Sequence, residues 1–275
     1  MEIQFIISQS IYKMSNLIQS QVYDTDSSDD EDVVKKKKKK IPKLPNRVVV
    51  IKNSEKDSGG WMESWLKPKK RSPGHIPHPF RLLALGGVGR GKSNCCKNVF
   101  LRHQSSSKKF QKLIIITCSE DSTEWDDCDP DDVLIEIPDL DIFDGAEKTC
   151  VILDDFETLK LNKEQLRKLS TLMRFVSSHR NVSCMLSYQS FFDTPPICRK
   201  VANCFMIYKP NSHQERDCIA NRVGVNGDKM KMIFKEHITG TYDHLFVDKT
   251  INTPYPLRKN IYEVIEKNCS DSDSD

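Results

Sequence analysis

Residues 81–93 read RLLALGGVGRGKS: a short apolar run, a glycine-rich loop, and then lysine and serine. Gly86 and Gly91 bound the loop at the spacing that lets backbone N–H groups surround a phosphate. Lys92 is placed to reach the β- and γ-phosphates of ATP, and Ser93 to bind Mg²⁺. We therefore predict a strand, a phosphate loop and a helix, with these nucleotide-binding residues: Gly86, Gly87, Val88, Gly89, Arg90, Gly91, Lys92, Ser93 and Asn94.

Apolar runs further along the chain predict the rest of the fold. We expect buried strands at 113–117, 133–137, 151–153, 182–187 and 204–208, and a helix from Lys92 to about His103. Residues 162–178 show helical spacing, with one apolar face formed by Leu166, Leu169, Leu172, Met173 and Val176. Continuous apolar strands that alternate with amphipathic helices are typical of a parallel sheet covered on both faces. The predicted fold class is α/β: a doubly wound, mainly parallel P-loop NTPase fold of the RecA/ASCE-like type, with charged tails.

A second motif occupies residues 150–155, CVILDD, where an apolar strand ends in two acids. This is the Walker B pattern, in which Asp154 is expected to hold Mg²⁺ through water and Asp155 to orient and deprotonate the attacking water. Glu157 is a second candidate for that base. An ordinary surface acid pair is the alternative, but the chain between Lys92 and Asp154 accommodates a strand–helix–strand unit, which favours the catalytic interpretation.

Polar residues follow the strand that ends near Ser187. Gln189 is our first choice for a side chain that senses the γ-phosphate and Ser187 the second, while an ordinary polar loop is the alternative. An arginine finger, which stabilises transition-state charge on a neighbour's ATP, is also expected. Arg199 is the candidate for it, and Arg216 and Arg222 compete with it.

The two ends of the chain differ from the core in composition. An acidic block at 24–32 precedes six consecutive lysines at 35–40, and the last six residues read SDSDSD. Such like-charge blocks bury too little apolar surface to fold. We predict a disordered arm at 1–46, the ATPase domain at 47–265 and an acidic tail at 266–275. The lysine run indicates a nuclear-localisation signal or a contact with nucleic-acid phosphates, and a solvated linker is the alternative.

Bulk composition limits the partners and the compartment. The 275 residues carry a net charge of +3, so contact with nucleic acid requires local clusters such as residues 67–71. The ten cysteines include no C-x-x-C pair, and Cys150, Cys184 and Cys204 lie in apolar runs as small hydrophobes. This usage predicts a reducing intracellular compartment, with the nucleus slightly favoured by the lysine run. No signal peptide or membrane span is expected.

These segments together resemble the FtsK–HerA superfamily of DNA-pumping ATPases, and within it the viral genome-packaging ATPases of poxvirus-like viruses and Maverick/Polinton elements. The resemblance covers roughly residues 80–250 and is carried by segments 83–93, 151–155, 179–183, 189–190, 197–203 and 245–248. It implies a ring-shaped homo-oligomer that uses ATP and Mg²⁺ to translocate double-stranded DNA into a capsid. The roles of Lys92, Ser93, Asp154, Asp155 and Gln189 carry over, with Arg199 as the finger. The superfamily usually has glutamate at the position of Asp155, so the base is less firmly assigned than the metal ligand.

Other classes of P-loop protein remain alternatives at this point. A GTPase should carry an Asn-Lys-x-Asp motif, and the sequence has none. A small-molecule kinase would close an arginine-rich lid over its substrate, and no such segment stands out, while a helicase-like enzyme stays open. A nucleotide-binding protein that has lost hydrolysis is disfavoured by the intact Lys92, Ser93 and Asp154.

Overall fold

The computed structural model describes residues 72–105, 109–118, 123–156, 161–251 and 253–266. The arm predicted at 1–46, the basic cluster at 67–71 and Glu157 lie outside these residues. Glu266, the first residue of the predicted acidic tail, is the last residue of a strand. In the described part of the chain, no helix is long and apolar enough to cross a membrane.

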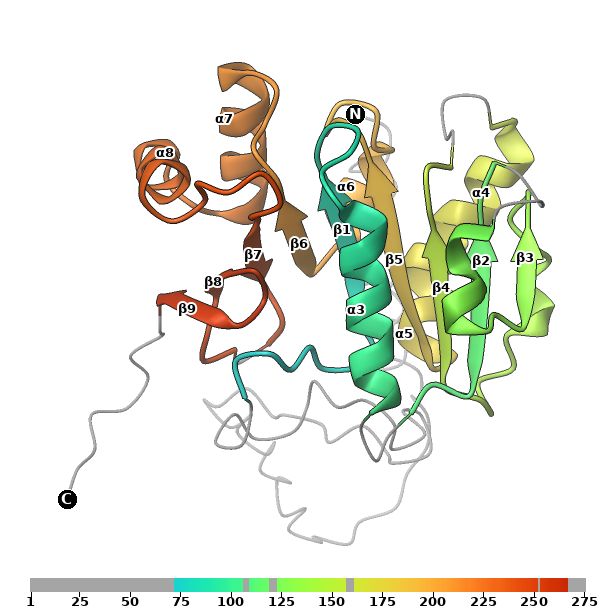
Figure 1. The fold of residues 1–275 in the computed structure, drawn as a ribbon. Helices are drawn as coiled ribbons and strands as arrows, with labels where there is room; N and C mark the ends of the chain where they lie inside the picture. The colour runs from blue at the N-terminus through green and yellow to red at the C-terminus, as the bar shows by residue number, and fades with distance from the viewer. Residues whose placement is uncertain (1–71, 106–108, 119–122, 157–160, 252, 267–275) are drawn as a thin grey trace, which may run out of the picture. The chain divides into compact units, whose positions relative to one another are not determined.

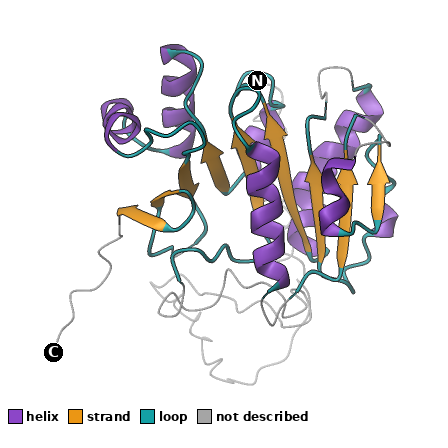
Figure 2. Cartoon of the chain, viewed as in Figure 1, coloured by secondary structure: helices purple, strands orange, loops and turns teal. Residues whose placement is uncertain are grey.

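One sheet organises the described residues, with the strand order β3-β2-β4-β5-β1-β6-β7-β8-β9 (Figures 1 and 2). The six strands from β3 to β6 in that order run parallel, and the last three are added antiparallel. The strands are β1 Arg81–Leu85, β2 Lys112–Ile116, β3 Asp132–Leu134, β4 Thr149–Leu153, β5 Val182–Tyr188, β6 Cys204–Ile207, β7 Leu245–Asp248, β8 Leu257–Lys259 and β9 Glu263–Glu266.

Helices cover both faces of this sheet, as predicted. Along β1, Leu82 and Ala84 pack into one apolar cluster with α3, and Leu83 and Leu85 pack into a second cluster with α4, α6, α7 and α8. Figure 1 shows α3 crossing one face of the sheet beside β1. The helices are α3 Lys92–Gln104, η3 Thr123–Cys128, η4 Leu140–Ile142, α4 Lys163–Thr171, η6 Leu172–Val176, α5 Ser177–His179, α6 Pro196–Val201, α7 His213–Val223 and α8 Gly227–Glu236. The doubly wound α/β fold class is confirmed.

The helix predicted over 162–178 forms as α4, a π turn (η6) and α5 in succession. Four residues of its predicted apolar face are buried, but Leu166 is 39% exposed, so its assignment to that face was wrong. Gln165 is buried instead, one turn before Leu169. Its Oε1 accepts a hydrogen bond from the Ile137 N–H (2.8 Å), which explains why an amide takes the inward position.

One further prediction needs correction. The strand expected at 133–137 ends at Leu134, where its register with β2 ends opposite Ile116, and Ile135 and Glu136 are exposed. Cys118 is also exposed, and its thiol donates to the Asp155 carbonyl oxygen (2.8 Å). The three thiols predicted in apolar runs are buried. Burial raises the pKa of the Cys184 thiol to about 12, which keeps it protonated and unreactive.

Strand order brings the predicted motifs to one edge of the sheet. β5 lies between β1 and β4, with Leu85 opposite Tyr188 and Leu153 opposite Leu186. Because the three strands are parallel, the residues that follow them meet at the same edge. β7 runs antiparallel to β6 with Leu245 opposite Ile207, so the turn before β7 reaches this edge as well. The sequence interpretation did not include β7, β8 or β9 as strands.

Candidate nucleotide-binding site

The phosphate loop begins where β1 ends and is held by both neighbouring strands. The Gly86 N–H donates to the Tyr188 carbonyl (3.1 Å), and the Tyr208 N–H donates to the Leu85 carbonyl (2.9 Å). A Cβ atom on Gly86 would lie 2.6 Å from the Tyr208 Cβ, so only glycine allows this approach. The Tyr208 hydroxyl also donates to the Gly91 carbonyl (3.2 Å), which fixes the far end of the loop.

Gly91 caps α3 in a left-handed conformation, with φ of 84°, and contributes no side chain to the helix terminus. The first turn of α3 contains no acidic residue. By contrast, α4, α7 and α8 each have a capping side chain, from Asn162, Ser212 and Asn226. The first N–H groups of α3 therefore lack the side-chain acceptor that α4, α7 and α8 possess, and they suit an external anion.

Lys92 adds positive charge to this open terminus. Its side chain is buried, and Nζ donates to the Gly87 carbonyl across the loop (3.2 Å). Ser93 is half-buried in the same turn, and Asn94 is exposed. Val88 at the tip of the loop is 77% exposed. Backbone donors, a buried ammonium group and a nearby hydroxyl together fit a polyphosphate.

Asp154 follows β4 directly and is buried, with 3% of its surface exposed. Two side chains position its carboxylate: the Ser187 hydroxyl donates to Oδ1 (2.5 Å) and the Trp125 indole N–H donates to Oδ2 (3.2 Å). Each oxygen keeps a lone pair for a further donor, such as a water bound to a metal. Ser187 and Trp125 therefore define which way Asp154 faces.

The surroundings of the Cys96 thiol indicate that the phosphate loop and Asp154 are close together. It lies one turn after Lys92 on α3 and is fully buried. Burial raises the pKa of Cys96, the negative charge of Asp154 raises it further, and the positive charge of Lys92 opposes the rise. Both charged groups therefore act on the same thiol, as expected if they flank one site.

Asp155 differs from Asp154 in its exposure, its backbone conformation and its hydrogen bonds. It is exposed, its φ is 46°, and its N–H donates to the Ser187 hydroxyl oxygen (3.1 Å). Ser187 thus holds both acids at once, donating to one and accepting from the other. Asp155 therefore lies at the surface, whereas Asp154 is enclosed.

The loop after β5 is anchored by a carboxylate that the sequence interpretation missed. Gln189 is exposed at the strand end, and the next residue, Ser190, donates to Glu215 Oε1 (2.9 Å). The Phe191 and Asn211 N–H groups also donate to Glu215, at 2.7 and 3.0 Å. Glu215 therefore joins the loops that follow β5 and β6. Its only sequence signal is the pattern Ser212-x-x-Glu215 at the start of α7, which is typical of a helix N-terminus.

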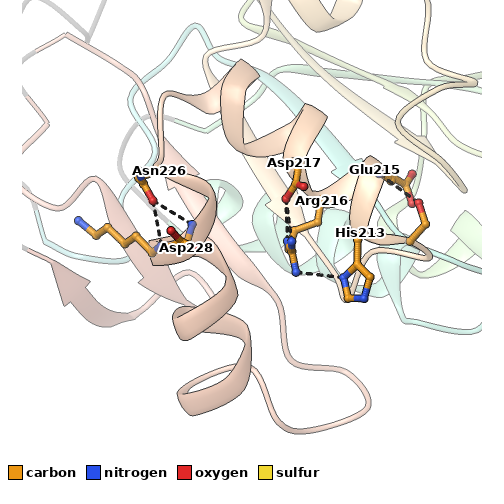
Figure 3. Close-up of polar contacts among 8 residues, drawn as sticks. His213, Glu215, Arg216, Asp217, Asn226 and Asp228 are labelled. Atoms are coloured by element: carbon orange, nitrogen blue, oxygen red, sulfur yellow. Dashed lines mark hydrogen bonds and ion pairs between the residues drawn. The ribbon is translucent and has the colours of Figure 1, made fainter.

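The three arginines considered as fingers have different surroundings. Arg199, on α6, is half-buried with its guanidinium over the Phe191 ring (4.8 Å to the ring centre). Arg216 is bonded to Asp217 (2.8 Å) and His213 (3.1 Å), as Figure 3 shows. Arg222 is exposed on the surface of α7. Arg199 follows Gln189 in the segment between β5 and β6, whereas Arg216 and Arg222 belong to α7.

The residues present also fit Mg²⁺. No group of three or more His, Cys, Asp or Glu side chains that could enclose a metal occurs among the described residues. Mg²⁺ does not require such a cage, since it commonly binds one or two carboxylates together with water and substrate phosphates. Ser93 and Asp154 are the side chains that would hold it, and its charge would neutralise the phosphate oxygens.

Comparison with known proteins gives structural likenesses alone: no family model and no curated protein matches the sequence. The genome packaging NTPase B204 of Sulfolobus turreted icosahedral virus 2, in complex with ATP-gammaS, is 16% identical with a TM-score of 0.48, over 71% of this chain and 100% of that chain. The cytoplasmic domain of the type VII secretion ATPase EccC of Thermomonospora curvata is 12% identical with a TM-score of 0.47, over 71% and 26% of the two chains. The pCW3 conjugation coupling protein TcpA with ATPgS is 14% identical with a TM-score of 0.42, over 69% and 61%. The chain's own strand order and loop geometry establish its P-loop NTPase fold.

Proposed function

We propose that this protein is a Mg²⁺-dependent ATPase that translocates double-stranded DNA, packaging the genome of a virus or virus-like element into a capsid. The observation that carries the ATPase part is the open, uncapped terminus of α3 beside a buried aspartate, Asp154, that two other side chains position. A carboxylate with a purely structural role would be expected to accept hydrogen bonds from backbone N–H groups, as Glu215 does. Asp154 instead keeps acceptor capacity at the edge where a phosphate would lie.

Each residue of the site has a role in this proposal. Lys92 and the N–H groups of the loop bind the β- and γ-phosphates, and Ser93 and Asp154 hold Mg²⁺. Asp155, exposed and next to the metal acid, orients the attacking water and accepts its proton. Glu157 remains the second candidate for this base. Gln189 contacts the γ-phosphate, and Ser187 keeps the two acids in register.

The DNA-translocating part rests on the resemblance of the sequence to genome-packaging ATPases. In that proposal the protein forms a ring, and Arg199 of one subunit reaches the ATP of the next. The basic segments at 35–40 and 67–71 would contact DNA phosphates, which makes binding weaker as salt rises. The ATPase domain extends over 47–265, between a charged arm and an acidic tail, and works in the reducing interior of a host cell, with the nucleus favoured by the lysine run.

An ATPase assay with and without duplex DNA tests both parts. We expect the wild type to hydrolyse ATP with Mg²⁺ and to turn over faster when DNA is added, whereas Lys92→Ala is slower by about 10²–10³-fold in both conditions. If DNA does not change the turnover, the proposal of a DNA motor is wrong and the proposal of an ATPase stands. Absence of Mg²⁺-dependent hydrolysis in the wild type would remove both.

Subunit mixing tests the finger. Arg199→Ala subunits supply an intact base, and Asp155→Asn subunits supply an intact arginine. If Arg199 acts on the neighbouring subunit, mixtures of the two inactive proteins regain part of the activity. No recovery at any ratio would take Arg199 out of this role, and Arg216→Ala provides the matched control because that side chain is engaged with Asp217 and His213.

A further inference from the structure

An exposed aromatic ring lies directly against the phosphate loop. Tyr242 is 68% exposed, the second largest exposed fraction among the large apolar and aromatic side chains in the described part of the chain. Its Cδ1 atom lies 3.5 Å from the point that a Cβ on Gly91 would occupy. The ring therefore contacts the start of α3 while most of its surface stays open to a ligand.

The turn that carries Tyr242 is firmly held. The Asp243 N–H donates to the Gly240 carbonyl (3.2 Å), and the Asp243 carboxylate accepts from the Gly240 N–H (2.8 Å) and the Asn260 amide (2.8 Å). Lys259 forms an ion pair with the same carboxylate (3.1 Å). The hydrogen bond from Asn260, with the Gly240 N–H and Lys259, lowers the pKa of Asp243 to about 2, so the anchor stays ionised.

Two contacts join this turn to the loop and to the sheet. The Arg90 guanidinium, within the phosphate loop, donates to the Thr241 carbonyl (3.3 Å). The His244 N–H donates to Asn260 Oδ1 (3.0 Å), and the His244 ring is buried against the Tyr208 ring beneath the loop. Tyr242 thus projects from a turn whose neighbours on both sides are fixed, at a constant position relative to Gly91.

Strand order places Tyr242 on the opposite side of the loop from the metal acid. β5 and β4, with Asp154 after β4, lie on one side of β1; β6 and β7 lie on the other, and Tyr242 precedes β7. A nucleoside triphosphate that directs its terminal phosphate to Asp154 must extend its nucleoside in the other direction, over the start of α3. That direction leads to Tyr242.

We infer that Tyr242 is the platform on which the base of the bound nucleotide stacks. The inference rests on the proposed nucleotide site and deepens it. An aromatic ring recognises the flat face of a base and not its hydrogen-bonding edge, so the contact adds affinity for any purine nucleotide with little choice between adenine and guanine. Arg90 supports the platform by holding its turn against the loop.

Calorimetric binding of Mg²⁺·ATP and of Mg²⁺·tripolyphosphate separates the base contact from the phosphate contacts. For Tyr242→Ala we expect ATP binding weaker by on the order of 10-fold, since one base–aromatic stack is lost, and unchanged binding of tripolyphosphate. Tyr242→Phe keeps the ring and should bind ATP as the wild type does. Phe175→Ala removes another half-exposed aromatic side chain, far along the sequence on η6, and should change neither affinity.

The results distinguish this inference from the nucleotide site itself. If the wild type binds both ligands and Tyr242→Ala leaves the ATP affinity unchanged, the platform is wrong and the nucleotide site stands. Equal loss of ATP and tripolyphosphate in Tyr242→Ala would also overturn the platform, because the substitution would then act through the loop. A wild type that binds neither ligand removes the site and the platform together.

Discussion

Two helices start at the same edge of the sheet, after the neighbouring strands β1 and β6, and their N-termini are built in opposite ways. At α7, the Ser212 hydroxyl accepts from the Glu215 N–H (3.1 Å), and the Glu215 carboxylate satisfies donors of two loops. At α3, the cap is Gly91, with no side chain, and the first turn carries Lys92 in place of an acid. One terminus is closed by the chain itself, and the other is left open.

This difference indicates which of the two helix termini is available to bind a ligand. A closed terminus contributes to stability, because its N–H groups have permanent acceptors. An open terminus beside a buried lysine gives up that stability and gains a place for an anion. The buried acid after β4, Asp154, is bonded by Ser187 and Trp125, so it keeps acceptor capacity for a metal.

Removing the positive charge from the open terminus should have the largest effect. Lys92→Ala is expected to lower kcat of ATP hydrolysis by about 10²–10³-fold, the usual result of deleting a donor that stabilises transition-state charge. Steady-state kinetics with saturating Mg²⁺·ATP measure it. Lys163→Ala, an exposed lysine at the start of α4, is the control and should keep wild-type turnover. Comparable activity in both variants would mean that the open terminus does not bind phosphate.

Changing the acid of the closed terminus should affect folding first. Glu215→Gln replaces one acceptor oxygen by an amide donor that faces buried N–H groups, at a cost of about 2–3 kcal/mol in the free energy of unfolding. Urea denaturation measures the loss. Glu236→Gln, at the exposed end of α8, should be neutral. An unchanged unfolding free energy for Glu215→Gln would contradict the structural role assigned to this carboxylate.

Ser187→Ala tests the positioning of the metal acid. With the hydroxyl gone, Asp154 and Asp155 lose their common partner, and we expect kcat to fall by about 10-fold with a higher Mg²⁺ requirement, a loss equivalent to one hydrogen bond. Ser183→Ala is matched to it, since Ser183 lies on the same strand and its hydroxyl oxygen accepts from the buried Phe80 N–H (3.1 Å). Both variants should lose stability, and only Ser187→Ala should change the magnesium dependence. If both variants showed the same magnesium dependence, Ser187 would have a packing role only.

The smallest effect is expected at the cap of α7. Ser212→Ala removes one capping hydrogen bond and should lower the free energy of unfolding by about 1 kcal/mol, with ATP hydrolysis unchanged. Chemical denaturation and the ATPase assay on the same preparation measure both. A larger loss of activity than of stability would show that the closed terminus takes part in catalysis.

The sequence predicted the part of the fold that long apolar runs define. β1, β4 and β5 are recognisable because they are buried on both faces, and the loop with Lys92 follows a fixed pattern. β7, β8 and β9 were not assigned because strands of three or four residues leave little periodic signal. Leu166 was misplaced because a helical face read from spacing alone does not reveal that Gln165 has a buried partner.

The candidate site was predictable to the same extent. Asp154 could be identified because it ends a buried strand. Trp125, Glu215 and Tyr242 could not, because each lies on a helix or turn whose position depends on the folded sheet. Ser187 was chosen as a possible phosphate sensor, whereas its hydroxyl is bonded to Asp154 and Asp155.

A crystal structure of the full chain with Mg²⁺ and a slowly hydrolysed ATP analogue tests the central claim most directly. We predict the phosphates at the N-terminus of α3 in contact with Lys92, and Mg²⁺ bound by the Ser93 hydroxyl with Asp154 in its coordination sphere or bonded to its waters. A nucleotide bound elsewhere, or a metal held by neither Ser93 nor Asp154, would contradict it.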